Sequence, residues 1–400
     1  MAETLHDMGF TSSLADPDVW YRAAVKPKSG FQYYEYVLVY VDDILALSHQ
    51  PKEIMKVLGS LYRLKDDSVE RPKRYLGATI KEWRFPDDTT KVCWGMSSEQ
   101  YVQEAIRTVE LELAKVGKAL KGKASTPLSS GYRPELDLSP LLDEEGANYY
   151  MNLIGILRWA VELGRIDIHV DVALLASFLM QPRKGHLEQV FHIFSYLKQH
   201  KRSTMVFDDA PVEWDESVFQ KHDWEDFYKG AKEAVPLNAP EPRGNAVQMN
   251  CFVDADHAAN RVTRRSHTGV VVFVNRAPIL WHSKAQNTVE TSTFGSEFVA
   301  MRIATELVEG LRYKLRMFGV PLEGPTNMFC DNQSVVTNTT LPSSTLKKKH
   351  NAIAYHRVRE AVAAGTIRVA KVSSEKNVAD MLTKSLPGPR LHDLAQRVLY

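Results

Sequence analysis

From residue 249 onward, the apolar residues follow an order of spacings that constrains the fold more than any other feature of the chain. Patterns typical of strands fall in five stretches: residues 249–253, 268–274, 278–282, 327–330 and 366–372. Helical patterns fall in three: residues 292–316, 350–363 and 378–382. Three strands, a helix and then alternating strands and helices predict one mixed five-stranded sheet with helices packed on it.

Single acidic residues stand at the ends of these elements: Asp254, Glu297, Asp331 and Asp380. Ligands of α/β sheets gather where strand ends meet helix starts, so we expect these carboxylates to converge. Four converging carboxylates would hold two Mg²⁺ ions, or Mn²⁺, roughly 4 Å apart, which suits the cleavage of a phosphodiester. Taken alone, each acid fits a surface charge or a helix N-cap better, Asp331 and Asp380 being the candidate caps. The order of the elements favours the functional interpretation.

Two adjacent carboxylates, Asp42 and Asp43, lie between the apolar residues 36–39 and 44–47. Both apolar stretches favour strands, and the pair falls where a hairpin would turn. Carboxylates held this close repel each other unless a cation lies between them, so a divalent ion such as Mg²⁺ is the expected occupant. For an isolated tetrapeptide, a plain polar turn is the favoured alternative.

The remaining patterns place mixed elements first and helices second. The predicted elements are a helix at 54–61, a strand at 74–80, a helix at 98–118, a loop at 126–131 and a helical stretch at 147–203. Residues 207–248 are acidic and then rich in Pro, Asn and Gly, which favours an inter-domain linker. We therefore predict an α/β (α+β) fold class in four parts: residues 1–128, 129–206, 207–248 and 249–390.

Bulk composition narrows the classes of function. Four hundred residues allow two or three domains with cores of their own. The net charge of +1 means that nucleic-acid binding would need clustered basic residues. Cys93, Cys251 and Cys330 stand far apart, which favours a reducing, intracellular compartment, cytoplasmic or nuclear, over disulfides or zinc. No apolar run reaches membrane-spanning length, and we expect no membrane contact.

Over about residues 8–395 the chain resembles the polymerase–ribonuclease H region of copia-type LTR retrotransposon polyproteins. The polymerase and connection motifs are Tyr40-Val41-Asp42-Asp43, Leu64-Lys65, Tyr75-Leu76-Gly77, Leu153-Ile154-Gly155 and Arg165-Ile166-Asp167-Ile168. The ribonuclease H motifs are Val253-Asp254-Ala255-Asp256, Thr268-Gly269, Trp281-x-Ser283-Lys284, Ser296-Glu297-Phe298, Asp331-Asn332 and Ala379-Asp380-x-x-Thr383-Lys384. The resemblance implies a partial reverse-transcriptase palm and thumb, a helical connection and a ribonuclease H-like domain, in that order.

The resemblance also implies parts that this sequence lacks. A third polymerase carboxylate belongs on a strand well upstream of Tyr40, but Asp7, Asp16 and Asp18 have the pattern of a loop. The RNA-directed DNA polymerase function is therefore expected to be incomplete, with the missing palm and fingers supplied by a longer polyprotein. Residues 373–376 lack the histidine that helps proton transfer in many ribonucleases H. His350 is the candidate replacement, and an ordinary histidine at a helix start is the favoured alternative.

Basic residues near these motifs are candidates for contact with a nucleic-acid backbone. They are Arg261, Arg264, Arg265, Lys284 and Lys348, to which the polymerase resemblance adds Lys65 and Tyr75. Such contacts give salt-dependent binding with little sequence preference. Charge runs are usually solvated faces, so the position of Arg264 and Arg265 beside Asp254 is what favours the interpretation. The implied substrate is an RNA–DNA hybrid, recognised by groove shape and 2′-hydroxyls.

Three functional hypotheses follow. The first is a metal-dependent ribonuclease H, a hydrolase and endonuclease, in which Asp254, Glu297, Asp331 and Asp380 bind two ions. The second is a catalytically inactive retroelement remnant that only binds nucleic acid. The third is a full reverse transcriptase, which would need its missing strand from a separate chain. The complete set of ribonuclease H acids favours the first.

Overall fold

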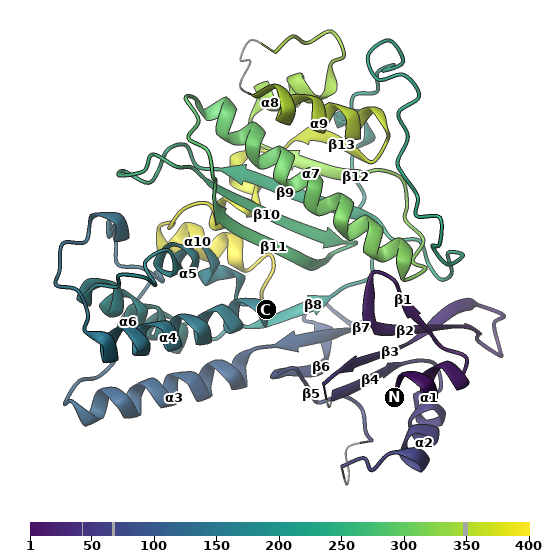
Figure 1. Ribbon diagram of the computed structural model, residues 1–400, viewed down its shortest axis with the longest axis horizontal. Helices are drawn as coiled ribbons and strands as arrows, with labels where there is room; N and C mark the ends of the chain where they lie inside the picture. Colours follow the sequence, from purple (N-terminus) through teal and green to yellow (C-terminus); the bar gives the residue numbers. More distant parts are fainter. Residues whose placement is uncertain (42, 66–68, 347–350) are drawn as a thin grey trace.

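The structure is a computed structural model that describes residues 1–41, 43–65, 69–346 and 351–400. Its strands form three sheets, and a group of helices lies beside the five-stranded one (Figure 1). The mixed α/β fold class is therefore confirmed. Among the described residues, no helix has both the length and the apolar character needed to cross a bilayer.

The N-terminal sheet has four antiparallel strands in the order β1-β2-β3-β4. They are β1 Thr11–Ser13, β2 Asp16–Val25, β3 Gln32–Tyr40 and β4 Asp43–Leu47. The predicted hairpin is confirmed, because Tyr40 pairs with Asp43. Helices α1 (Ala2–Asp7) and α2 (Pro51–Leu61) bury Leu5 and Leu58 against this sheet.

The loop predicted around Asp16 and Asp18 is wrong, because both residues lie in β2. The Asp and Pro residues at the start of β2 suggested a turn. The rest of the strand nevertheless pairs with β3 without interruption, from Val19 opposite Leu38 to Val25 opposite Gln32. This long pairing outweighs the local turn preference, and Pro17 is tolerated because it precedes the paired stretch.

A second antiparallel sheet has the order β5-β6-β7-β8. Its strands are β5 Arg74–Tyr75, β6 Ala78–Phe85, β7 Asp88–Ser97 and β8 Thr204–Phe207. The single strand predicted at 74–80 is wrong, because the chain turns there into a hairpin. Leu76 and Gly77 make the turn with φ angles of 49° and 88°, and a two-residue turn with positive φ matches the twist of the flanking strands.

The helical part connects β7 to β8. It comprises α3 Glu99–Lys115, α4 Glu144–Glu162, α5 His169–Ala176 and α6 Lys184–Gln199. The helix predicted at 98–118 is confirmed, and the stretch predicted at 147–203 is helical with breaks between α4, α5 and α6. Val190, Phe194 and Leu197 on α6 are buried in a common core with Leu153 of α4, as their spacing predicts.

The five-stranded sheet has the order β11-β10-β9-β12-β13. Its strands are β9 Met249–Ala255, β10 His267–Val274, β11 Ala277–Ala285, β12 Thr326–Cys330 and β13 Ile367–Lys371. β9, β10 and β11 are antiparallel, whereas β12 runs parallel to both β9 and β13. The predicted mixed five-stranded sheet is therefore confirmed, and its strands follow one another along the chain in the predicted sequence of elements.

The two faces of this sheet are covered by different parts of the chain. Helices α7 (Thr293–Met317), α8 (Gln333–Thr340) and α9 (Ala352–Ala363) cover one face, and Figure 1 shows α7 lying across it. Val271 of β10 belongs instead to the core of the helical part. The other face packs on α5 and on residues Val378–Leu382, which belong to the same core.

The C-terminal segment also enters the core of the helical part. It contains the 3₁₀-helix η6 (Val378–Leu382) and helix α10 (Gly388–Ala395). Met381, Leu382 and Leu394 are fully buried in the core that α3–α6 share. The backbone N–H of Tyr400 donates to the carbonyl of Thr204 in β8 at 2.9 Å. The end of the chain thus joins two sheets and a helical core.

Residues 207–248, expected to link domains, pack against the five-stranded part and the N-terminal sheet. Trp214 stacks near Phe329 of β12, with ring centroids 4.4 Å apart, and Glu233 pairs with Arg312 of α7 at 2.6 Å. The carbonyl of Glu241 accepts a hydrogen bond from the hydroxyl of Tyr34 in β3. This stretch therefore lies along the five-stranded part and contacts the N-terminal sheet.

Candidate metal centre

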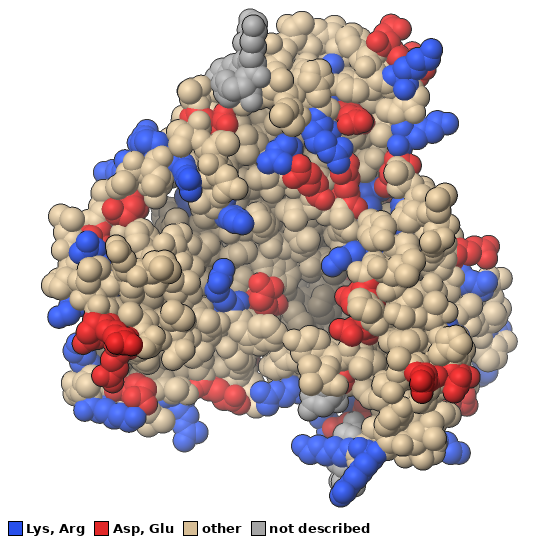
Figure 2. Space-filling view, in the orientation of Figure 1, with Lys and Arg blue, Asp and Glu red and all other residues tan. Residues whose placement is uncertain are grey.

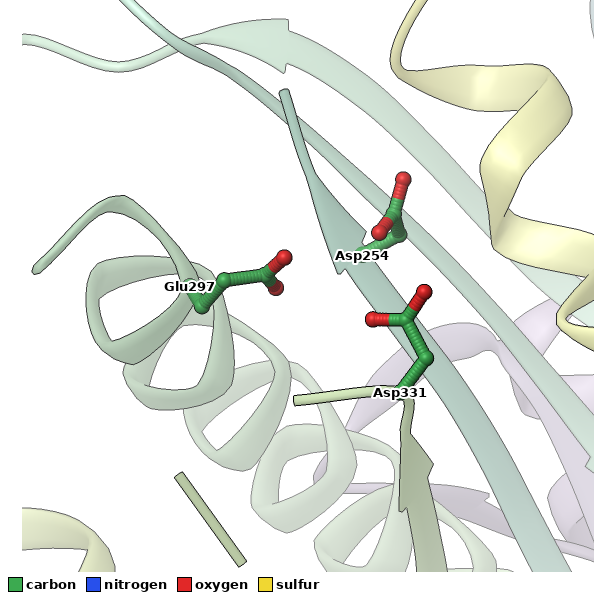
Figure 3. Close-up of side chains that lie close together, drawn as sticks. All are labelled: Asp254, Glu297 and Asp331. Atoms are coloured by element: carbon green, nitrogen blue, oxygen red, sulfur yellow. The ribbon is translucent and has the colours of Figure 1, made fainter. Parts of the chain in front are cut away.

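Three carboxylates converge at one edge of the five-stranded sheet. Asp254 lies near the end of β9, Glu297 in the first turns of α7, and Asp331 directly after β12 (Figure 3). One oxygen of each carboxylate lies within 4.8 Å of the others. Asp254 and Glu297 are buried and Asp331 is half-buried. The structure therefore brings together three of the four acids that the sequence singled out.

The topology explains this convergence. β9 and β12 are parallel neighbours, so their carboxyl ends meet at the same edge. Helix α7 starts at that edge, with Ser292 as its N-cap accepting from the N–H of Gly295 at 3.2 Å. Asn332, and not Asp331, caps α8 by accepting from two backbone N–H groups. Asp331 is thus not used as a cap, and its carboxylate is left to the cluster.

The environment of the three acids penalises their negative charge. Burial, and then the charges of Asp254 and Asp331, raise the pKa of Glu297 to about 9. Burial likewise raises the pKa of Asp254 to about 6. A cation bound among these groups would favour their ionised forms. Because all three ligands are carboxylate oxygens, the site fits a hard divalent ion such as Mg²⁺ or Mn²⁺.

Two hydroxyl groups hold the carboxylates in place. Thr383 Oγ1 donates to Asp254 Oδ2 at 2.7 Å, and Ser374 Oγ donates to Asp331 Oδ2 at 2.6 Å. Each bond occupies one oxygen and leaves the other available to a ligand. Ser374 was not predicted, since a single serine at the start of a short 3₁₀-helix carries no periodic signal. Thr383 was predicted only as a member of the motif Ala379-Asp380-x-x-Thr383-Lys384, without a role of its own.

Gly269 allows the element that carries Thr383 to approach the sheet. It pairs with Asp254 across β9 and β10. A Cβ at this position would lie 2.6 Å from the backbone oxygen of Ala379 and 2.9 Å from Cβ of Leu382. η6 therefore lies directly on Gly269, next to Asp254. Asn377 fixes the start of η6 by donating to the carbonyl of Val253 at 3.0 Å.

Asp380, the fourth predicted acid, is not part of the three-carboxylate cluster. It lies in η6, where Asn377 and not Asp380 is the N-cap. Its Oδ1 pairs with Lys384 Nζ at 2.5 Å, and its Oδ2 lies 3.6 Å from Arg390. The helix-cap alternative therefore fails for Asp380 as it does for Asp331, and a cation pair takes its place.

The Asp42-Asp43 motif has a different environment. Asp42 lies outside the described residues, and Asp43 is exposed at the start of β4. Burial and then the charges of Asp43, Asp18 and Asp16 raise the pKa of Tyr75. The correction to β2 thus places its two acids in the same electrostatic environment as Asp43. In the part of the chain that the structure describes, Asp43 belongs to no group of three metal-type ligands.

The candidate nucleic-acid contacts are spread over several elements. Arg264 and Arg265 are exposed in the β9–β10 connection, and Lys284 is exposed near the end of β11, opposite Thr268. Lys65 is also exposed. Lys348 and His350 lie outside the described residues. Figure 2 shows Lys and Arg interspersed with Asp and Glu over one face, so the described residues on that face form a surface of mixed charge and not a continuous basic patch.

The five-stranded sheet and its carboxylates define a mixed α/β protein with a candidate metal centre at one edge of the sheet. No family model matches the chain. Its sequence is 26% identical over 356 residues to a "Retrovirus-related Pol polyprotein from transposon TNT 1-94" of Nicotiana tabacum, covering 88% of this chain and 23% of the relative. It is 25% identical over 394 residues to the Pol polyprotein from transposon RE1 of Arabidopsis thaliana, covering 98% and 23%.

A further match comes from yeast. The "Putative transposon Ty5-1 protein YCL074W" of Saccharomyces cerevisiae is 25% identical over 253 residues, covering 62% of this chain and 65% of that protein. The chain is thus similar to copia-type retrotransposon polyproteins, as its motifs indicated. It spans about a quarter of the length of the plant relatives.

Solved structures give weaker likenesses. The N-terminal RNase H domain of rv2228c from Mycobacterium tuberculosis is 13% identical and covers 38% of this chain and 98% of that one, with a TM-score of 0.27. LC11-RNase H1 in complex with an RNA/DNA hybrid is 16% identical and covers 34% and 94%, with a TM-score of 0.28. At these scores neither likeness bears on the site.

Proposed function

We propose that the chain is part of a retrotransposon polyprotein in which residues 249–390 cleave the RNA strand of RNA–DNA hybrids with two divalent ions, Mg²⁺ or Mn²⁺. The observation that carries this proposal is the convergence of Asp254, Glu297 and Asp331 from β9, α7 and the end of β12. Three buried or half-buried carboxylates with few cations beside them are costly unless they bind an ion.

In this proposal the residues divide the work. Asp254, Glu297 and Asp331 would hold one ion, and Asp380 with Asp254 would hold the other. Two bound ions would activate a water molecule and stabilise the leaving oxygen at the phosphodiester. Thr383 and Ser374 orient the carboxylates through their hydrogen bonds to Asp254 and Asp331.

We further propose that exposed basic residues position the hybrid. Arg264, Arg265 and Lys284 would contact phosphates, so binding would weaken with salt and show little sequence preference. The minor groove and the 2′-hydroxyls of the RNA strand would distinguish the hybrid from DNA. Lys348 would add a phosphate contact, and His350 would help proton transfer. Both residues lie outside the part of the chain that the structure describes.

The rest of the chain keeps its proposed polymerase ancestry. We take residues 1–128 as a partial palm and thumb, residues 129–206 as the connection and residues 207–248 as a linker. Asp42, Asp43, Lys65 and Tyr75 would belong to the polymerase site. Because the chain spans 23% of the plant relatives, a longer polyprotein would supply the missing palm and fingers.

The test is cleavage of a labelled RNA–DNA hybrid by the full chain with Mg²⁺ or Mn²⁺, compared with Asp254→Asn and Asp331→Asn. We expect the wild type to cut the RNA strand and both variants to lose at least two orders of magnitude in rate, since each variant removes an ion ligand. Asp226→Asn, an exposed acid remote from the cluster in sequence, is the control. Wild-type rates in both site variants would refute the proposal. Hybrid binding without cleavage at any ion concentration would favour an inactive remnant.

A further inference from the structure

We propose that Lys384 is a built-in cation that competes with the second divalent ion for Asp380, and so makes that ion the weaker of the two. The inference rests on the proposed function and concerns how the same site is loaded. It predicts two unequal ion affinities, with the inequality set by one side chain of this chain.

The contact between Lys384 and Asp380 is direct. The two residues are four positions apart, across the end of η6, and Nζ lies 2.5 Å from Asp380 Oδ1. The Asp380 side chain is 15% exposed, whereas that of Lys384 is 50% exposed. The carboxylate is therefore held near the sheet while the ammonium group can leave for solvent. An ion could displace this amine without unfolding η6.

A second cation near Asp380 is already committed elsewhere. Arg390 lies 3.6 Å from Asp380 Oδ2, beyond hydrogen-bond length. Its guanidinium donates to the carbonyls of Ser374 and Glu375 at 2.7 and 2.8 Å. Arg390 thus holds the loop that carries Ser374, the hydrogen-bond donor to Asp331. Of the two cationic side chains, Lys384 is therefore the one that an ion would displace from Asp380.

The charge of Lys384 also faces the other acids. Besides Asp380, to which it is bonded, its amine interacts electrostatically with Asp254 and Asp331. The three-carboxylate cluster has no such directly bonded cation among the described residues, since its partners are the hydroxyls of Thr383 and Ser374. Competition should fall mainly on the ion that needs Asp380.

The size of the effect follows from the kind of ion pair. A half-exposed pair of this type contributes up to about 1 kcal/mol, which corresponds to roughly a fivefold change in affinity. Removing the competing charge should therefore tighten the binding of the second ion by up to roughly fivefold. If Lys384 only braced η6, its removal would loosen Asp380 and weaken that ion instead. The two roles predict changes of opposite sign.

The experiment is calorimetric titration of the metal-free full chain with Mn²⁺. The variants are Lys384→Met, Lys384→Gln, Lys384→Arg and Asp380→Asn, each first checked by its melting temperature in chelator. We expect the two neutral variants to tighten the weaker binding event and leave the stronger one unchanged. Lys384→Arg keeps the charge and should resemble the wild type, and Asp380→Asn should lose the weaker event.

Each result decides the matter. Unchanged or weakened second binding in both neutral variants overturns the role of Lys384, even if the hybrid is cleaved normally. A wild type that shows only one event supports the inference if a second event appears in a neutral variant, and opposes it if none does. Absence of any Mn²⁺ binding in the wild type refutes the proposed function itself, and the inference falls with it. Because the expected change is a gain, a variant that merely misfolds cannot imitate it.

Discussion

The hydroxyl of Ser385 donates a 2.5 Å hydrogen bond to the carboxylate of Asp171, which is 1% exposed. This bond joins helix α5 to the segment that follows η6. Burial raises the pKa of Asp171 to about 7. The acid therefore depends on Ser385 whenever it is ionised, and the helical part has a polar attachment beside the candidate metal centre.

Replacing Ser385 with Ala should destabilise the protein above pH 7. The substitution leaves a buried carboxylate without this donor, which costs about 1–3 kcal/mol. The cost should shrink at pH 5, since the folded-state pKa of about 7 means that Asp171 is then protonated. Urea unfolding at both pH values measures it. Ser385→Thr keeps a hydroxyl and serves as the control, and equal losses at the two pH values would contradict the account.

Gly269→Ala should separate η6 from the sheet. The new Cβ would lie 2.6 Å from the oxygen of Ala379, a backbone atom that cannot move away alone. We expect a loss of stability of about 1–3 kcal/mol, together with weaker Mn²⁺ binding because Thr383 is drawn away from Asp254. The measurements are chemical unfolding and ion titration.

A matched control for Gly269 is available on α7. A Cβ at Gly310 would meet nothing within 4 Å, so Gly310→Ala should be neutral or stabilise the helix by up to about 1 kcal/mol. If both alanine variants bind Mn²⁺ as the wild type does, the close approach of η6 is not what positions Asp254.

Ion binding should release protons and tighten as pH rises. With pKa values raised to about 9 and about 6, Glu297 and Asp254 hold protons in the metal-free site at pH values where free carboxyl groups would be ionised. An ion binds the ionised forms, so affinity should increase from pH 6 to pH 9. Mn²⁺ titration in buffers of different protonation enthalpy counts the protons.

The residue that should flatten this pH dependence is Glu297. Glu297→Gln removes the group with the highest raised pKa, and the dependence between pH 7 and pH 9 should then weaken together with affinity. Glu306→Gln, on the exposed side of α7, should change neither. An affinity that is independent of pH in the wild type would mean that the three acids are already ionised without a metal.

Asp254→Asn should stabilise the metal-free protein at pH 8 while removing ion binding. Since the folded-state pKa of Asp254 is raised from 3.8 to about 6, its contribution to stability is fully present below pH 4 and is lost as pH rises through 6. An uncharged amide avoids that loss, which amounts to about 3 kcal/mol at pH 8. Urea unfolding in chelator at pH 4 and pH 8 measures the difference. A variant that is less stable than the wild type at pH 8 would contradict the burial argument.

Much of the five-stranded part could be predicted from the sequence, because its elements carry their own periodicity and stand in an informative order. The sheets before residue 249 could not be predicted as well. β7 pairs with β8, which follows four helices, and β2 begins with Asp and Pro residues that suggest a turn. Such pairings are decided by contacts that are distant in sequence and that local patterns do not record.

The candidate site shows the same limit. The three converging acids followed from strand ends and helix starts. The partners that orient or neutralise them did not, because Ser374 is 43 residues from Asp331 in sequence and Lys384 meets Asp380 only through the helical turn at η6. The helix caps illustrate the difficulty, since Asn332 and Asn377 take the capping role that the sequence had also allowed for Asp331 and Asp380.

The packing of residues 378–400 into the core of α3–α6 has a consequence for a nicked chain. A protease that cuts in the exposed stretch around residues 229–232 would separate the five-stranded part from the helices along the chain, but not in space. Leu382, Leu394 and the bond from Tyr400 to Thr204 would still hold the fragments together. Such a cut should give two bands on a denaturing gel, whereas the two fragments should elute together in size-exclusion chromatography under native conditions.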